Sequence, residues 1–239
     1  MRVAIVSDIH GNRTAFEAVL ADLKQTSPDI VFHGGDLADA GSGPVEIVDQ
    51  IRNLGWKGVA GNTDQMLASP ETFETFANRA PKLASLWDAI RNMAAFTRER
   101  LGEERLSWLR SLPLMQINEL VALVHASPGN PWVAPSAQDS DEQFNSVYSS
   151  IAQTIVVYGH IHQPFVRRIG SQTIANSGSV GQPHDGDHRS SYLLIDGFQV
   201  EIRRVEYELE REIQAVRSSG LPHAEWIVRT IESASPQMP

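Results

Sequence analysis

Short apolar segments that end abruptly in polar residues are the feature of this sequence that most constrains its fold. Val3–Ser7 and Asp29–Phe32 are apolar at most positions and run into DIHGN and HGGDLADAG, and GVAGNTD (58–64) has the same form. Segments of this kind predict strands buried on both faces. Apolar residues at helical spacing predict intervening helices over Thr14–Lys24 and Pro44–Leu54. Three successive strand–loop–helix units favour a largely parallel sheet, which binds ligands beyond the carboxyl ends of its strands.

The remainder of the chain changes character twice. Residues 66–118 are rich in helix formers and predict a helical insertion that packs over or beside the sheet. Strand patterns then return in ELVALVH (119–125), QTIVVYGH (153–160), FVRRIG (165–170), QTIAN (172–176), SYLLID (191–196) and FQVEIRRVEY (198–207). The last of these alternate apolar and polar residues across short turns, which predicts antiparallel hairpins. Two further helices are predicted within residues 208–233, over Glu208–Arg217 and Ala224–Ser233.

Composition excludes several classes of function. The 239 residues fit a single α/β domain over 1–239. A net charge of −9 without a dense Lys/Arg block argues against a protein that binds nucleic-acid backbones. The absence of cysteine excludes disulfides, cysteine nucleophiles and thiolate metal sites. Since there is no signal-peptide pattern and no apolar stretch near about 18 residues, we expect a cytoplasmic protein without a membrane partner.

Carboxylate, amide and imidazole side chains stand at the ends of the predicted strands. They are Asp8, His10, Asp36, Asn62, His125, His160 and His162. Side chains two positions apart on an extended chain point the same way, so the D-x-H and H-x-H pairs each present two ligands to one side. Oxygen and nitrogen donors without thiolate suit manganese, iron or zinc better than calcium. Two ions about 3.5–4 Å apart, sharing one carboxylate, would require roughly this number of donors.

Each of these residues also has an ordinary structural explanation. An Asp at a strand end is typical of turns and helix caps, H-x-H also occurs as two unrelated surface histidines, and Gly-Asn is a turn sequence. However, four of the eight histidines directly follow apolar strands, together with two Asp and one Asn. Their joint occurrence favours one shared site. A single-metal hydrolase of unrelated fold would need fewer ligands than the sequence offers.

The order of these motifs resembles the calcineurin-like metallophosphoesterase family. D-x-H-G-N, G-D, G-N, V-H and G-H-x-H occur in that order, and NSGSVGQPHDGDHRSSYLLID (176–196) is similar to the segment that follows G-H-x-H in the family's small bacterial phosphodiesterase branch. The resemblance covers residues 1–65 and 119–196 but not the 66–118 insertion. It implies a four-layer α-β-β-α sandwich of two facing mixed sheets, with two divalent metal ions at their shared edge.

The resemblance also implies a role for each donor. One ion would be held by Asp8, His10 and His162. Asp36 would bridge both ions, and the second would be completed by Asn62, His125 and His160. A hydroxide bridging the ions would attack phosphorus in line while the ions stabilise the phosphoryl oxygens. Manganese is the first choice of metal, with iron, zinc, nickel and magnesium as alternatives. Gly11, which has no side chain, would leave room for the backbone beside the site.

Further residues are expected to act on the substrate. Those expected to act in catalysis are Asp36, His125 and Asp39, and those expected to contact the substrate are Asn12, Arg13 and Asn62. Asn12 has an equal alternative as the cap of the helix beginning near Thr14, and Arg13 has the alternative of a solvated charge at the helix start. Asp64 would be a hydrogen-bond partner near the ligands or a cap.

Two positions depart from the family pattern. Many relatives have G-N-H-[ED], whose His is available as general acid, and G-D-x-x-D-R-G; here Asp39 is retained, but Thr63 replaces the His and Ala40 the Arg. Thr63 is unsuited to general acid catalysis near neutral pH, and the missing Arg removes a bidentate phosphate ligand. Phosphodiesters are therefore favoured, with monoesters as a further option. Other candidates for an acid, each with the alternative of a neutral surface histidine, are His33, His184 and His188.

The partner is expected to be a small phosphorylated substrate, with nucleotide-derived compounds among the options. A Pro-broken loop over 127–144 would shape its pocket, with Trp132 either stacking on the substrate or anchoring the loop. Aromatic and Met residues between 87 and 108 are expected to pack in the core. The alternative function is a non-catalytic protein-binding scaffold on the same fold, which should have lost some ligands, whereas all seven are present.

Overall fold

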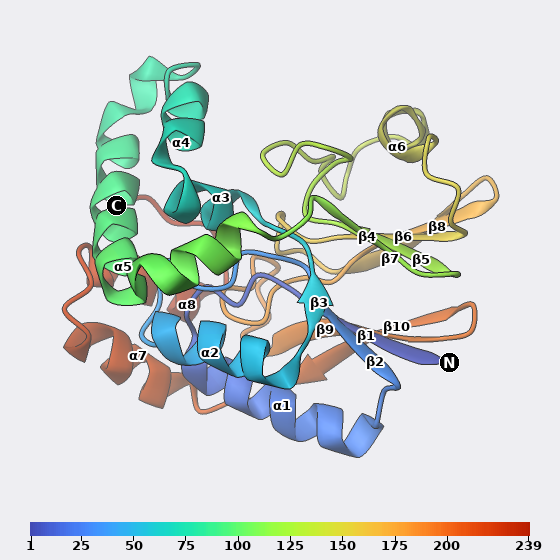
Figure 1. The fold of residues 1–239 in the computed structure, drawn as a ribbon, viewed down its shortest axis with the longest axis horizontal. Helices are drawn as coiled ribbons and strands as arrows, with labels where there is room; N and C mark the ends of the chain where they lie inside the picture. Colours follow the sequence, from blue (N-terminus) through green and yellow to red (C-terminus); the bar gives the residue numbers. More distant parts are fainter.

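Two five-stranded sheets lie face to face in the computed structural model, which describes residues 1–239 (Figure 1). The first has the strand order β10-β9-β1-β2-β3 and consists of β1 (Arg2–Val6), β2 (Ile30–His33), β3 (Lys57–Gly58), β9 (Ser190–Asp196) and β10 (Gln199–Val205). β1, β2 and β3 run parallel, whereas β9 is antiparallel to both β1 and β10. The first sheet therefore contains strands from both the N-terminal and the C-terminal parts of the sequence.

The second sheet is also mixed. It has the order β4-β5-β6-β8-β7 and consists of β4 (Met115–Ile117), β5 (Val121–Val124), β6 (Ile155–Tyr158), β7 (Phe165–Ile169) and β8 (Gln172–Asn176). β5, β6 and β8 run parallel, and the edge strands β4 and β7 are antiparallel to their neighbours. The predicted hairpins are present as β7–β8 and β9–β10, the latter in the first sheet.

Burial on both faces explains the continuous apolar sequences of the central strands. Val3 and Ile5 of β1 belong to the cluster between the two sheets, which also contains Leu123 of β5 and Val157 of β6. The alternate residues of β1, of which Val6 is one, pack against helices outside the first sheet. The sequence needs an apolar side chain at every position of such a strand.

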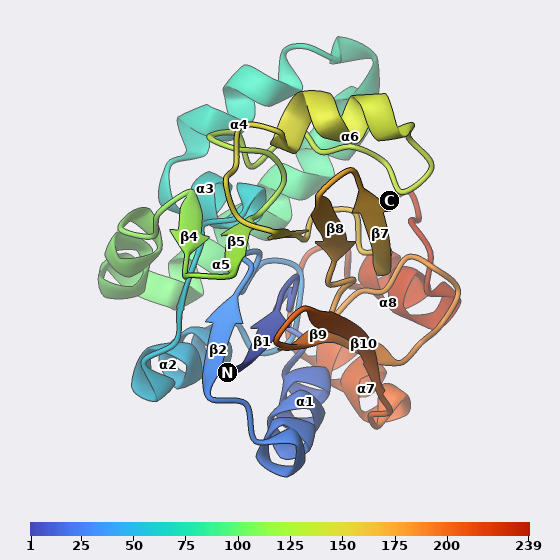
Figure 2. The ribbon, with the colours of Figure 1, turned by 90° about the vertical axis from the view of Figure 1, so that its right-hand side faces the viewer.

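Helices cover the outer face of each sheet. α1 (Arg13–Thr26) and α2 (Pro44–Leu54) pack on the first sheet, and α6 (Asp141–Tyr148) packs on the second through Phe144 and Tyr148 (Figure 2). This order of helix, sheet, sheet and helix confirms the predicted four-layer α-β-β-α sandwich. No helix combines the length and the apolar character that a membrane span requires.

The remaining helices lie beside the sandwich, at the end where the labels α4 and α5 stand in Figure 1. They are α3 (Asn62–Ala68), α4 (Pro70–Ala77), the short turn η1 (Pro81–Leu83), α5 (Ala84–Arg110), α7 (Leu209–Ser218) and α8 (Ala224–Ser233). The helical insertion thus begins before residue 66 and ends at Arg110. Met115–Ile117, which the sequence places in the insertion, is strand β4 because it pairs with β5.

The loop predicted over 127–144 ends earlier than expected, because α6 starts at Asp141. Ser140 caps this helix by accepting the backbone N–H of Gln143, whose side-chain oxygen accepts the N–H of Ser140 at 2.9 Å. This reciprocal capping box is visible in the sequence as Ser-x-x-Gln and could have located the helix.

Candidate metal centre

Loops that follow five strands meet at one edge of the sandwich. Asp8 and His10 follow β1, and Asp36 follows β2. Asn62 begins α3 just after β3. The three other donors are reached from the second sheet, where β5 ends beside His125 and β6 ends before His160 and His162. Since these strands run parallel within each sheet, their carboxyl ends bring all seven predicted donors together.

The Asp36 carboxylate lies between two imidazoles. Its Oδ2 is 3.5 Å from Nε2 of His10, and its Oδ1 is 3.5 Å from Nε2 of His125. The side chains of Asp36 and His125 are 3% and 0% exposed. One buried carboxylate therefore presents a different oxygen to each half of the centre.

The first half of the centre contains Asp8, His10 and His162. One donor atom from each lies within 4.8 Å of the other two. Nε2 of His162 is 3.2 Å from Asp8 Oδ1 and 3.2 Å from Nε2 of His10. These three side chains are the ones that the sequence assigns to a first ion.

The second half of the centre contains Asn62, His125 and His160. Asn62 Oδ1 is 3.0 Å from Nε2 of His125 and 2.9 Å from Nδ1 of His160. Asp8 also belongs here, since its carboxylate forms a second group of donors within 4.8 Å with Asp36 and His125. The sequence assigns Asp8 to the first ion alone, so its closeness to both halves was missed.

Backbone carbonyls fix the orientation of three of the imidazoles. Nδ1 of His10 bonds to the carbonyl of Asp39 at 3.2 Å. Nδ1 of His125 bonds to that of Gly34 at 2.8 Å, and Nδ1 of His162 to that of Gln182 at 2.6 Å. A carbonyl only accepts, so each Nδ1 carries the proton and each Nε2 directs a lone pair into the centre. Histidines that bind metals are oriented in this way.

The charges of the centre also suit cations. Asp8 and Asp36 are buried, and the ionic partners within 4 Å are histidines rather than Arg or Lys. Buried charges are stable only when paired or bound to metal. The residues present therefore fit divalent cations bound through oxygen and nitrogen.

Burial and carboxylates shift the histidine pKa values in opposite directions. Burial outweighs neighbouring Asp36 and lowers the pKa of His10, and burial together with the charge of His125 lowers the pKa of His160 to about 4. Burial is outweighed at His125 and at His162, where adjacent carboxylates raise the pKa. His10 and His160 are thus held neutral, the form that binds metal.

Five of the seven donors have backbones in the left-handed region. The φ angles are 55° at Asp8, 49° at His10, 52° at Asp36, 67° at His160 and 56° at His162. For residues other than glycine this conformation costs about 1–2 kcal/mol each. Such conformations gather at functional sites, where the surrounding structure enforces them.

Asp64 holds the Asp36 loop in place. Its carboxylate accepts backbone N–H groups from Asp36 at 2.8 Å, Leu37 at 3.0 Å and Gly61 at 2.9 Å. A side chain on Gly61 would collide with Asp36 Oδ1, so only glycine fits there. The hydrogen-bonding role predicted for Asp64 is present in the structure.

Asn12 and Arg13 make contacts within the protein. Asn12 accepts the N–H of Ala15 at 2.9 Å as the cap of α1, and its amide donates to the carbonyl of Gly181 at 2.9 Å. Arg13 pairs with Glu17 at 2.8 Å and lines a surface hollow separate from the metal centre. The structure thus gives both residues the alternative roles that the sequence left open.

Asp39, Thr63 and His184 line a cavity that adjoins the centre. Asp39 accepts a hydrogen bond from Thr97 at 3.0 Å, and burial raises its pKa to about 7. The Thr63 hydroxyl is buried without a partner. His184 stacks on His162 with ring centroids 4.3 Å apart.

The two other histidines considered as acids do not line this cavity. His33 is fully buried beside Trp108 rather than on the surface. His188 bonds through Nδ1 to the carbonyl of Ile231 at 3.2 Å. The structure also reveals aromatic residues in the lining of the cavity, including Phe76, Trp87 and Trp132. The sequence indicates core packing for Trp87. Its place beside a cavity could not be predicted, because helical spacing does not show which side of a helix meets a cavity.

A two-sheet sandwich that gathers Asp, Asn and His side chains at its strand ends has the donor set of a protein that binds divalent cations. The sequence profile of the calcineurin-like phosphoesterase superfamily domain matches residues 1–197, and the chain belongs to this family. This confirms the resemblance seen in the sequence motifs.

Relatives and solved structures agree with this assignment. An uncharacterized protein of Methanocaldococcus jannaschii is 32% identical over 248 residues, covering 94% of this chain and 95% of the relative. A metallophosphoesterase from Sphaerobacter thermophilus has a TM-score of 0.79 at 28% identity, covering 98% of this chain and all of that one. A symmetrical bis(5'-nucleosyl)-tetraphosphatase of Klebsiella pneumoniae is 31% identical over 157 residues, which are 63% of this chain and 51% of the relative. The chain thus matches about half the length of that enzyme.

Proposed function

We propose that this protein is a phosphodiesterase that uses two divalent cations. The observation that carries the proposal is the position of Asp36, whose two oxygens lie 3.5 Å from His10 and from His125 on opposite sides. A carboxylate so placed can bridge two cations. The donors for the first are Asp8, His10 and His162, and those for the second are Asn62, His125 and His160.

The cations would supply Lewis acidity, which activates water and neutralises charge on the phosphoryl oxygens. The donor set of imidazole, carboxylate and amide supports manganese, with iron, zinc, nickel or magnesium as alternatives. The chain's own residues fix the geometry. Asp64 holds the Asp36 loop, and the carbonyls beyond each imidazole hold the rings.

The walls of the site support diesters as substrates. Hydrolysis adds water to phosphorus and breaks one phosphorus–oxygen bond, and the departing oxygen must take up a proton unless it is a weak base. Thr63 lines the site where many relatives have a histidine, and a hydroxyl does not titrate near pH 7. A diester with a weakly basic leaving group has little need of an acid. Asp39 fixes His10 through its backbone carbonyl. Its side-chain carboxyl, with a pKa raised to about 7, is the group in the cavity best suited to give the leaving oxygen a proton.

The substrate we propose is a small phosphorylated molecule. The cavity beside the centre has a volume of about 320 Å³, at the lower end of the range for small-molecule sites. Relatives named as bis(5'-nucleosyl)-tetraphosphatases support a substrate derived from nucleotides.

Metal analysis combined with hydrolysis tests the proposal. Metal-free protein would be loaded with Mn²⁺, and the bound metal and the hydrolysis of bis-p-nitrophenyl phosphate and p-nitrophenyl phosphate would be measured. We expect two ions per chain and faster cleavage of the diester. Asp36→Asn should lose at least about a hundredfold in kcat/KM, whereas Asp49→Asn, which removes a charge paired with Arg105 elsewhere, should not.

Each failure has a distinct meaning. A preference for the monoester would leave the metal site standing and contradict the argument from Thr63. Absence of both bound metal and hydrolysis would contradict the proposal and favour the protein-binding scaffold.

A further inference from the structure

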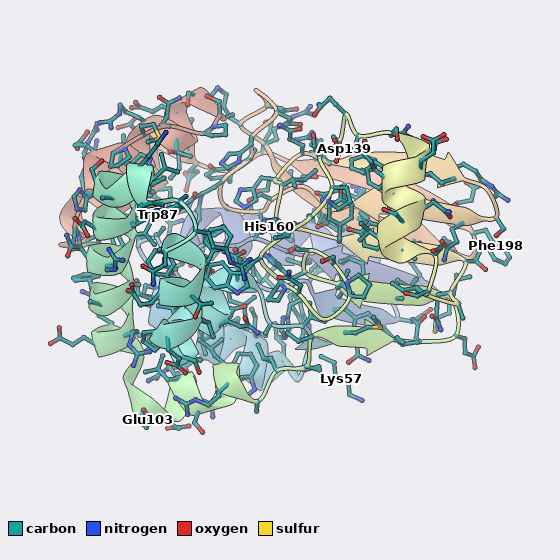
Figure 3. All side chains as sticks on the ribbon, turned by 90° about the horizontal axis from the view of Figure 1, so that it is seen from above. Lys57, Trp87, Glu103, Asp139, His160 and Phe198 are labelled. Atoms are coloured by element: carbon teal, nitrogen blue, oxygen red, sulfur yellow. The ribbon has the colours of Figure 1, made fainter.

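The cavity beside the metal centre has two chemically different walls. His10, Asn62 and His160 form the wall that belongs to the centre. Another part of the lining, here called the aromatic wall, is formed by Phe73 and Phe76 of α4, Trp87 of α5, Trp132 after β5 and Trp226 of α8. Figure 3 shows Trp87 on the helical side of the molecule and His160 near its middle. A substrate phosphate at the centre would therefore have the aromatic wall within reach of its ester group.

Four rings of the aromatic wall, those of Phe73, Phe76, Trp87 and Trp132, pack on one another, and three of them remain partly exposed. Phe76 and Trp132 lie with centroids 5.0 Å apart at 30°, and Phe73 meets Trp87 edge-on at 5.9 Å. Phe76, Trp87 and Trp132 are only half-buried although they lie beside a cavity. Stacked rings with free surface offer a site for another flat ring.

The aromatic wall offers carbon surface rather than polar groups. The indole N–H of Trp87 donates to the carbonyl of Ala80 at 2.8 Å, and that of Trp132 donates to Gln65 at 3.0 Å. The indole N–H of Trp226 donates to the carbonyl of Gln237 at 2.8 Å. All three donors are thus already used, and the group that binds here needs no hydrogen bond from them.

The cavity has no cationic side chain. None of its twenty lining residues is Lys or Arg. Arg13, which the sequence offers as a phosphate ligand, pairs with Glu17 and lines another hollow. Any phosphate beyond the one held at the metal centre would enter this cavity without a cationic side chain to pair with, which is unfavourable wherever the phosphate loses water.

We infer that the aromatic wall binds a flat, uncharged aromatic group, such as a phenyl ring or a nucleobase, attached to a single phosphate at the metal centre. This inference rests on the proposed function and narrows it. It disfavours chains of several phosphates, including the dinucleoside tetraphosphates for which some relatives are named. Trp132 determines the preference, because its ring is carried by a loop beside the centre.

Binding of phosphonates tests the inference without catalysis, since their carbon–phosphorus bond is not hydrolysed by a phosphoesterase. Titration calorimetry of the Mn²⁺-loaded protein would compare phenylphosphonate with methylphosphonate. We expect phenylphosphonate to bind about tenfold more tightly, because its ring is buried against other rings. Equal affinities, or no measurable binding of phenylphosphonate, would overturn the inference.

Three variants separate the ring from other effects. Trp132→Ala should remove the preference for phenylphosphonate. Trp132→Phe, which also loses the bond to Gln65 but keeps a ring, should retain most of it. Phe198→Ala changes a 72% exposed ring at the opposite end of the molecule and should have no effect (Figure 3). Loss of the preference in Trp132→Phe as well would assign the effect to the hydrogen bond and overturn the proposed role of the ring.

Kinetics distinguish failure of this inference from failure of the proposed function. Trp132→Ala should lower kcat/KM for bis-p-nitrophenyl phosphate about tenfold, mainly by raising KM. Unchanged cleavage by this variant, or faster cleavage of diadenosine tetraphosphate than of the diester by the wild type, would overturn the inference while the hydrolase stands. If neither compound is cleaved, the proposed function fails and the calorimetry still decides whether the aromatic wall binds a ring.

Discussion

Nε2 of His10 lies 3.2 Å from Nε2 of His162. Both rings have their Nδ1 bonded to a backbone carbonyl, so in their neutral forms two lone pairs point at each other. The nearby carboxylate of Asp8 adds negative charge to the same space. A cation between these atoms would convert repulsion into attraction.

We therefore expect metal to stabilise the protein. At a free Mn²⁺ concentration of 100 times its Kd, binding to the folded state alone adds about 2.7 kcal/mol to the free energy of unfolding. Thermal unfolding with and without EDTA measures this gain. His162→Asn should lose most of it, whereas His223→Asn, at an exposed left-handed position before α8, should keep it. An equal gain in both variants would place the metal elsewhere.

Gly61→Ala should impair the centre directly. A Cβ at this position would collide with Oδ1 and the backbone nitrogen of Asp36, although φ is an ordinary −87°. We expect loss of one bound ion and at least about a hundredfold lower activity. Gly129→Ala meets no atom within 4 Å but has φ of 72°, so it should cost about 1–2 kcal/mol of stability and leave metal content unchanged. Full metal binding by Gly61→Ala would refute the role given to this close approach.

Asp64→Asn should weaken metal binding without touching a ligand. The Asp64 carboxylate accepts three backbone N–H groups. In the Asn variant an NH2 group replaces one of its two oxygens, so a donor faces backbone donors and at least one hydrogen bond is lost. We expect a loss of about 3 kcal/mol in unfolding free energy and 10–100-fold in metal affinity, measured by denaturant titration and metal competition. Asp29→Asn, which removes an acceptor for one exposed N–H of Arg2, serves as the control.

Asn12→Ala should reduce stability rather than catalysis. Loss of the cap on α1 costs about 1 kcal/mol, and the carbonyl of Gly181 also loses its donor. KM should change less than about twofold, as should that of Arg13→Ala. Ser140→Ala, which removes the cap of α6, is the matched control, because it measures the loss of stability from a missing helix cap far from the centre. A large rise in KM for Asn12→Ala alone would restore its role as a substrate contact.

His33 makes the stability of the metal-free protein depend on pH. Burial lowers its pKa to about 4, whereas an unfolded histidine titrates near about 6.5. As pH falls from about 6.5 toward 4, the unfolded state binds a proton that the folded state does not, so stability falls in this window. The wild type should therefore lose about 2–3 kcal/mol more unfolding free energy than His33→Phe when the pH is lowered from 7.5 to 4.5, as measured by urea unfolding. A constant difference across this range would contradict the prediction.

The sequence predicts well that these seven side chains lie together, because most of them follow a buried strand. A continuous apolar run ending in Asp8 or His125 identifies both the strand and its polar end, and parallel strands bring such ends together. Trp132 and Phe76 were harder to place because their pairing depends on a loop and a helix far apart in the chain. Met115–Ile117 is too short to be recognised before its partner strand is known.

Asn12 shows a different limit. Its sequence context fits a helix cap and a phosphate contact equally, and only the position of the Ala15 N–H decides between them. Likewise, the closeness of Asp8 to both halves of the centre follows from the distance between two sheets, which no local pattern encodes.

The loop after β1 is held by residues far away in the chain, which has a consequence for the order of events during synthesis. Ser7 and Asp8 are synthesised long before the residues that hold them, because their carbonyls accept bonds from Val180 and Gly181, and Ser179 donates to the carbonyl of Asp8 at 2.7 Å. The first three strands can associate early, but their loop is locked only after most of the chain has emerged. A nascent chain in which only the first three strands have emerged therefore carries four of the seven donors, and the set is complete only once His162 has been added.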